Sequence, residues 1–116
     1  MNERPIYVTI IGWLYIAVGV VGFAYHATEL RSTYPIPFDF ITIELISLAA
    51  ALAGIYLLRG KNWARWLTVA WMAIHVIVSA FHSWTEMAMH ALFCAILVYL
   101  LFGPRARQYF HVSKTP

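Results

Sequence analysis

The sequence predicts an all-α protein, an up-down bundle of four transmembrane helices with the N- and C-termini on the cytoplasmic side. Composition is the first reason, because 62% of the 116 residues are apolar and only 11% are charged, against roughly 45–50% and about 25% in soluble domains. The second is a series of four long apolar stretches, and the third is the one-sided placement of lysine and arginine. A surface with so little charge must face something other than water, and lipid is the obvious partner.

Four predicted spans fill the domain formed by residues 1–104, and residues 105–116 follow as a short cytoplasmic tail. A bilayer core about 30 Å thick requires about 20 helical residues, with a range of roughly 17–25. The stretches that meet this length run over residues 6–27, 38–58, 63–81 and 86–102. The first is a long apolar run that no A-x-A site follows, so we expect an uncleaved span rather than a signal peptide.

The connections between the spans carry turn residues. Pro35 and Pro37 end any helix in the first connection, because proline lacks the backbone N–H that a helix interior needs. Gly60 falls in the tight turn between the second and third spans, where glycine is expected at the C′ position of the preceding helix. Gly103 and Pro104 end the fourth span.

The basic residues predict how the chain is oriented. Seven of the eight lysines and arginines fall on one side of the predicted spans. They are Arg4, Arg59, Lys61, Arg65, Arg105, Arg107 and Lys114. Only Arg31 falls on the other side. Because cytoplasmic loops carry an excess of lysine and arginine, this bias predicts cytoplasmic termini.

Small residues recur at helical spacing on the first two spans. They are Gly12, Gly19 and Gly22 on the first span and Ser47, Ala51 and Gly54 on the second. Small side chains let helix backbones approach closely in a membrane, so we expect both stripes to face protein. Glu44 shares the second stripe, because it lies three residues before Ser47. Its carboxyl group is therefore predicted to point into the bundle rather than into lipid.

The ionisable side chains within the spans are predicted to gather in the outer half of the bundle. Glu44 lies six residues inside the start of the second span, about 9 Å deep at about 1.5 Å per residue. His75 lies at a similar depth in the third span, and the antiparallel turn between these spans brings the two side chains near each other. This predicts a polar pocket that opens to the outer face. Its expected lining residues are Glu44, His75, Ser79, His26 and Tyr15.

Two interpretations of Glu44 and His75 stay open at this stage. One is a single buried hydrogen bond that fixes helix register, typically worth about 0.6–2 kcal/mol in membranes. The other is a site for a ligand, a proton or a cofactor. The second is attractive because a carboxylate placed in hydrocarbon costs at least about 2.5–3.5 kcal/mol.

A metal-binding hypothesis rests on His82, Glu86 and His90. Glu86 and His90 are four residues apart, which puts them on one helix face, and His82 could join from the preceding span. Imidazole suits copper, zinc and iron, and the nearby methionines suit Cu(I). A haem with two histidine ligands is a further alternative, with His75 or His82 as one ligand. The competing interpretation is a solvated helix start capped by a serine or threonine.

Enzymatic chemistry has little support in the sequence. The single cysteine, Cys94, excludes an internal disulfide and every reaction that needs a CxxC pair. We expect it to be a small packing residue. The sequence contains no Ser-His-Asp order, Gly-rich phosphate loop or HExxH motif. The net charge of +3 fits membrane orientation rather than nucleic-acid binding.

Three segments carry a family resemblance. They are residues 54–65 (GIYLLRGKNWAR), residues 101–110 (LFGPRARQYF) and residues 4–13 (RPIYVTIIGW). Together they resemble small bacterial four-helix integral membrane proteins of unknown function, a likeness that is mostly topological. The resemblance implies a bacterial inner membrane and no particular activity. Small multidrug resistance transporters are similar in size but carry an essential glutamate in the first span, where this sequence has none.

The sequence therefore predicts a non-enzymatic multi-pass membrane protein, a ligand-binding or accessory subunit. Its expected partners are the lipid bilayer and either further copies of itself or a larger membrane complex, with no nucleic acid. One alternative is a redox protein that binds haem or a metal. Another is a small proton-coupled transporter that relies on Glu44.

Overall fold

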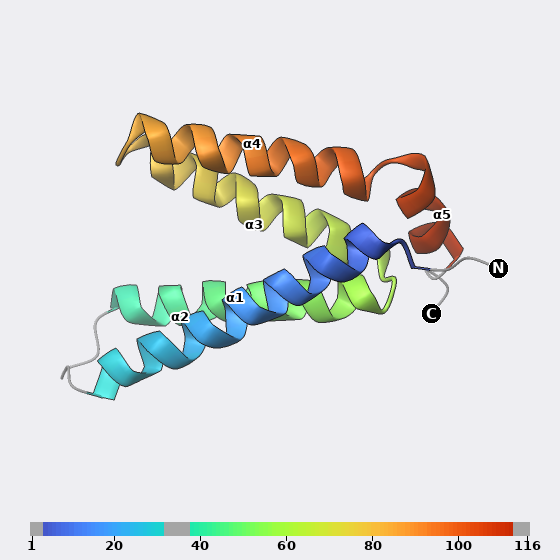
Figure 1. Cartoon of the computed structure of the whole chain (residues 1–116). Helices are drawn as coiled ribbons and strands as arrows, with labels where there is room; N and C mark the ends of the chain where they lie inside the picture. The colour runs from blue at the N-terminus through green and yellow to red at the C-terminus, as the bar shows by residue number, and fades with distance from the viewer. Residues whose placement is uncertain (1–3, 32–37, 113–116) are drawn as a thin grey trace.

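A computed structural model of the chain describes residues 4–31 and 38–112, and these residues form five α-helices and no strand (Figure 1). The helices are α1 (Ile6–Arg31), α2 (Phe38–Leu58), α3 (Asn62–Ala80), α4 (Trp84–Leu101) and α5 (Pro104–Val112). The prediction of an all-helical chain with four long apolar helices is confirmed. The predicted helix stop at Pro35 and Pro37 lies outside the described residues, as does Lys114.

The turn between α2 and α3 is built as its glycine predicts. Gly60 has a φ of 74°, which only glycine adopts without strain. The N–H of Gly60 donates to the carbonyl of Leu57, and the N–H of Lys61 donates to the carbonyl of Tyr56, both at 3.0 Å. This pair of bonds is the Schellman motif with Gly60 at C′. Helix α3 begins at Asn62, directly after Lys61.

The helices α1 and α2 pack backbone against backbone. A Cβ atom added at Gly54 would lie 2.4 Å from the carbonyl oxygen of Gly12, and one added at Gly19 would lie 2.5 Å from the backbone nitrogen of Ala51. No real side chain fits at such distances. The predicted small-residue stripes therefore face each other, and they make α1 and α2 one tight hairpin.

The chain forms two hairpins, α1–α2 and α3–α4, which diverge from one end to the other (Figure 1). We call the end that holds α5 and the α2–α3 turn the terminal end, and the end that holds the α3–α4 turn the far end. Hydrogen bonds from the side chains of Tyr15 and Trp71 join the hairpins. The Tyr15 hydroxyl donates to the Thr68 carbonyl at 3.1 Å, and Trp71 Nε1 donates to the Ile46 carbonyl at 2.8 Å. The helices α1 and α4 barely touch.

The tail contains a helix, α5, that is not expected from the sequence. Helix α5 folds back on the terminal end and buries Phe110 completely. The guanidinium of Arg65 on α3 lies 5.0 Å from the centre of the Phe110 ring, and its Nη1 donates to the Leu101 carbonyl at 3.1 Å. Asn62 Oδ1 accepts from the same guanidinium. Arg65 thus holds together the start of α3, the end of α4 and α5.

One backbone carbonyl at the end of α2 receives two side chains from distant parts of the chain. Arg4 Nη1 donates to the Leu58 carbonyl at 2.8 Å, and the Tyr109 hydroxyl donates to the same oxygen at 2.7 Å. The last carbonyls of a helix have no partner within the helix. Here they are satisfied by residues that precede α1 and lie in α5.

The outward faces of the four long helices are apolar. Each helix exposes a large apolar side chain, for example Val21 at 66%, Leu45 at 61%, Ile77 at 62% and Tyr99 at 79%. Four helices are long and apolar enough to cross a membrane. A surface of this kind fits lipid and not water, which indicates a membrane protein. The side of the membrane that holds the termini stays a prediction.

Candidate functional site

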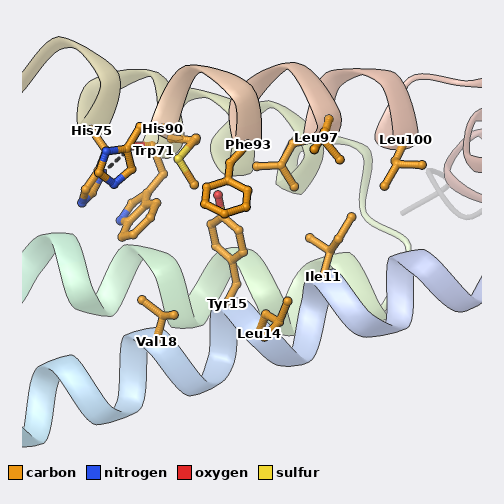
Figure 2. A pocket seen from close by; sticks show the side chains of 12 residues that line it. Ile11, Leu14, Tyr15, Val18, Trp71, His75, His90, Phe93, Leu97 and Leu100 are labelled. Carbon is orange, nitrogen blue, oxygen red and sulfur yellow. Dashed lines mark hydrogen bonds between the residues drawn. The ribbon is translucent and has the colours of Figure 1, made fainter. Parts of the chain in front are cut away.

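A cleft of about 490 Å³ lies between the two hairpins, with walls from α1, α3 and α4 (Figure 2). This volume falls within the range of roughly 300–1,000 Å³ that is usual for small-molecule sites. The cleft exists because α1 and α4 do not close on each other. Its lining residues are Ile11, Leu14, Tyr15, Val18, Trp71, Met72, His75, His90, Phe93, Ile96, Leu97 and Leu100.

Most of the cleft wall is hydrocarbon or aromatic carbon. Ile11, Leu97 and Leu100 line its terminal end, whereas His75 and His90 stand together at the opposite end of the row (Figure 2). The sequence predicts a polar pocket, but this cleft is apolar for most of its length. The reason is the divergence of the hairpins, which exposes the aliphatic faces of α1 and α4 to the space between them.

The ring of His75 is fixed by its own helix. Its Nδ1 lies 2.8 Å from the Trp71 carbonyl oxygen, one turn earlier. The imidazole also stacks on the Trp71 indole, with ring centres 3.9 Å apart and planes inclined by 31°. Because the indole N–H is itself bonded to the Ile46 carbonyl on α2, His75 rests on a side chain that does not turn freely.

His90 reaches the same place from α4. Its Nδ1 lies 2.9 Å from the Glu86 carbonyl oxygen and 2.7 Å from Ser79 Oγ on α3. The centres of the His75 and His90 rings are 5.9 Å apart. Two imidazoles on neighbouring helices thus share one end of the cleft. Ser79, which is 5% exposed, forms a hydrogen bond with the ring of His90.

The tautomer of each ring follows from these contacts. A carbonyl oxygen only accepts hydrogen bonds, so the contacts with the carbonyls of Trp71 and Glu86 assign the proton of each neutral ring to Nδ1. Ser79 Oγ then accepts a share of the His90 proton. Each neutral ring keeps a lone pair on Nε2, and neither Nε2 has a hydrogen-bond partner within the described part of the chain.

Tyr15 lines the cleft with its ring but not with its hydroxyl. The hydroxyl is bonded to the Thr68 carbonyl, and the ring packs edge-on against Trp71 with centres 5.3 Å apart. The predicted pocket role of Tyr15 is therefore limited to shape. Its polar atom belongs to the joint between the hairpins.

The predicted contact between Glu44 and His75 is not formed. Glu44 Oε1 is buried and has no hydrogen-bond partner, and no ion pair or hydrogen bond joins it to His75 among the residues that the structure describes. The physical reason lies in the neighbouring turn of α2. A Cβ atom at Gly22 would be 3.0 Å from Ser47 Oγ, so the helix face that carries Glu44 is turned toward α1. The His75 ring lies instead against α4.

His26 also lies apart from the cleft. It is half-buried on α1, and its ring packs edge-on against Tyr25 with centres 5.2 Å apart. Of the five residues predicted to line the pocket, Tyr15 and His75 do so, Ser79 supports the site through His90, and Glu44 and His26 do not line it.

The three residues of the metal hypothesis are not gathered around one point. His82 and Glu86 are exposed, and His82 Nδ1 lies 2.9 Å from the Val78 carbonyl oxygen. Within residues 4–31 and 38–112, no group of three or more histidine, cysteine, aspartate or glutamate side chains could hold a metal ion. The alternative of a capped helix start fits better, because Ser83 Oγ accepts from the Glu86 N–H at 3.3 Å.

No protein-family model, curated protein or solved structure matches this chain.

Proposed function

We propose that this chain is a non-enzymatic membrane protein that binds an apolar, lipid-like molecule in the cleft between its two hairpins. The observation that carries the proposal is the lining of the cleft, which is apolar along its length and polar only where His75 and His90 meet. A site with this lining suits a molecule with a long apolar part and a small polar head.

The way in which the hairpins are joined supports a lasting site rather than a gap that closes. The bonds from Tyr15 to α3 and from Trp71 to α2 hold the hairpins at a fixed separation. The side chains along the cleft stay accessible, for example Leu14 at 58% and Phe93 at 50%. Contact with a bound chain would cover them and would add van der Waals contacts, which favour packing within a membrane.

The test uses a hexadecyl chain with a terminal diazirine, cross-linked by light to the protein in nanodiscs and mapped by mass spectrometry. We expect saturable labelling at cleft residues such as Leu14, Phe93 and Leu97. Val18→Trp fills the cleft and should reduce this labelling several-fold. Val21→Trp is the matched control, because Val21 is exposed on the same helix and does not line the cleft.

Labelling that rises without saturation and falls equally on outward-facing residues would contradict the proposal. That outcome would mean that the cleft is filled by bulk acyl chains alone. Equal effects of Val18→Trp and Val21→Trp would contradict it as well.

A second candidate is a small proton-coupled transporter, and the observation that favours it is the unpartnered Glu44 Oε1. An ionisable side chain within a membrane span is costly and commonly marks a proton or ion pathway. Glu44→Gln should then abolish proton-driven uptake in liposomes while the helical content stays unchanged. Unchanged proton flux would remove this candidate and leave the binding proposal intact.

Assembly with further copies or with a larger membrane complex remains part of the proposal. The exposed apolar faces of all four long helices leave room for lipid or for partner helices. Cross-linking in native membranes tests this assembly. Cross-links between protein chains would indicate partner helices on these faces, and their absence would indicate that lipid covers them.

A further inference from the structure

The two imidazoles at the far part of the cleft define which head group it accepts, an inference that rests on the proposed function. We infer that the bound molecule is an uncharged lipid with one or two hydroxyl groups, and that these hydroxyls donate to Nε2 of His75 and Nε2 of His90.

The argument starts from what the site offers. Both Nδ1–H groups are used inside the protein, by the carbonyls of Trp71 and Glu86. Only the two Nε2 lone pairs remain, so these two cleft-lining residues offer two acceptors and no free donor from their rings. The polar part of a molecule that fits must therefore bring its own hydrogen.

Head groups without a donor are disfavoured for the same reason. An ether, ester or quinone oxygen would set its lone pairs against those of Nε2, and both would be left unsatisfied in an apolar space. Leaving a buried acceptor unpaired typically costs about as much as a lost hydrogen bond or more. A hydroxyl avoids this cost.

Charged head groups are disfavoured by the rest of the lining. No arginine, lysine, aspartate or glutamate lines the cleft among the residues that the structure describes. An ammonium group would have no countercharge there, and a phosphate would need protonated imidazoles. Transfer of an unpaired charge into such surroundings is expensive.

The two acceptor rings are held in fixed positions, where two hydroxyl groups of one small head group can reach both of them. The ring centres are 5.9 Å apart, and each ring is fixed by its own backbone contact. His75 is further held by the Trp71 indole, and His90 by Ser79. A rigid pair of acceptors loses little entropy on binding, and adjacent hydroxyls, as in an alkylglycerol, match a pair better than a single hydroxyl does.

The experiment measures competition against the diazirine probe by four unlabelled molecules with the same hexadecyl chain, in metal-free buffer with chelator. We expect 1-O-hexadecylglycerol to compete at least as well as hexadecanol. Hexadecanol should compete roughly three- to tenfold better than hexadecyl methyl ether, the range expected for one neutral hydrogen bond. Hexadecyl phosphate should compete less well than hexadecanol.

Variants assign the preference to the two rings. His75→Phe and His90→Phe should each reduce the advantage of the alcohol over the ether while saturable labelling persists. His82→Phe is the matched control. His82 lies in the turn between α3 and α4, is exposed, and does not line the cleft. Its alcohol preference should equal that of the unmodified protein.

Nitrogen-15 spectra of the imidazoles give a readout that needs neither ligand nor variant. His75 and His90 should each show a protonated Nδ1 and an unprotonated Nε2. A protonated Nε2 in either ring would overturn the inference, as would equal competition by alcohol and ether or stronger competition by the phosphate. Those results leave the proposed function standing if labelling saturates, whereas the absence of saturable labelling would remove the proposed function itself.

Discussion

The hydroxyl of Tyr15 on α1 donates to the backbone carbonyl of Thr68 on α3, 3.1 Å away, and this bond ties the two hairpins together beside the cleft. The partners are 53 positions apart in the sequence. The Tyr15 ring also packs on Trp71, which holds His75. Tyr15 thus connects the two hairpins and also contacts the residue that holds His75 at the polar end of the cleft.

Replacing this tyrosine tests the joint. Tyr15→Phe should lower the free energy of unfolding by about 0.5–1.5 kcal/mol, the net value of a typical hydrogen bond, and should leave the ring packing in place. Denaturation in mixed detergent micelles measures the change. Tyr25→Phe is the control, because the Tyr25 side chain is 61% exposed. An equal loss in both variants would show that the hydroxyl of Tyr15 has no special role.

Gly19 tests the close approach of α1 and α2. A Cβ atom there would lie 2.5 Å from Ala51 N and 2.6 Å from Ser47 O, both backbone atoms that cannot move aside. Gly19→Ala should therefore destabilise the protein by about 1–3 kcal/mol, as overpacking does. Gly22→Ala meets only the Ser47 side chain, at 3.0 Å or more, and should be tolerated better. The reverse order of stability would contradict the packing described here.

Arg65 tests how α5 is attached. Arg65→Lys keeps the charge but loses the planar guanidinium that bonds to Asn62 and the Leu101 carbonyl and lies over Phe110. Amide hydrogens of residues 107–110 should then exchange faster, with a local loss of about 1.5–3 kcal/mol, the value of a hydrogen bond to a charged group. Arg59→Lys is the control, since Arg59 is exposed. Unchanged exchange in Arg65→Lys would show that α5 is held by its apolar face alone.

A double-mutant cycle tests the separation of Glu44 and His75. Glu44→Gln and His75→Phe should change stability independently, so that their effects add within about 0.3–0.5 kcal/mol, as for residues without shared partners. Glu44→Leu should be neutral or stabilising, because it removes a buried oxygen that has no partner. A coupling energy above 1 kcal/mol, as an estimate for contacting residues, would restore the pair that the sequence predicts.

The long helices and their main turn could be predicted because each depends on local sequence. Apolar runs long enough to cross a bilayer specify α1 to α4, and the glycine at position 60 specifies how α2 ends. Helix α5 could not be predicted in this way. It has nine residues, too few for a stable isolated helix, and it depends on burial of Phe110 and on Arg65 from another part of the chain.

The arrangement of the candidate site depends on more than local sequence. The four-residue spacing of Glu86 and His90 puts them on one helix face, and the ring of His90 lies 5.9 Å from the ring of His75 on the neighbouring helix. The direction in which Glu44 points within the bundle depends on how its helix packs. Glu44 and Ser47 share one stripe of α2, and the close packing of the α1 glycines against Ser47 and Ala51 turns that stripe toward α1 rather than α3. The divergence of the hairpins, which makes the cleft, depends on packing between elements and has no local signature in the sequence.

The carbonyl of Leu58 has a consequence for how the chain can be altered. Because Arg4 and Tyr109 donate to this one oxygen, two segments that are more than a hundred positions apart in the sequence share a single anchor. Deletion of the chain from position 109 onward would therefore remove one of the two donors to the oxygen that also anchors Arg4. Any fusion or affinity tag should be judged by whether it preserves this shared anchor, whichever end of the polypeptide carries it.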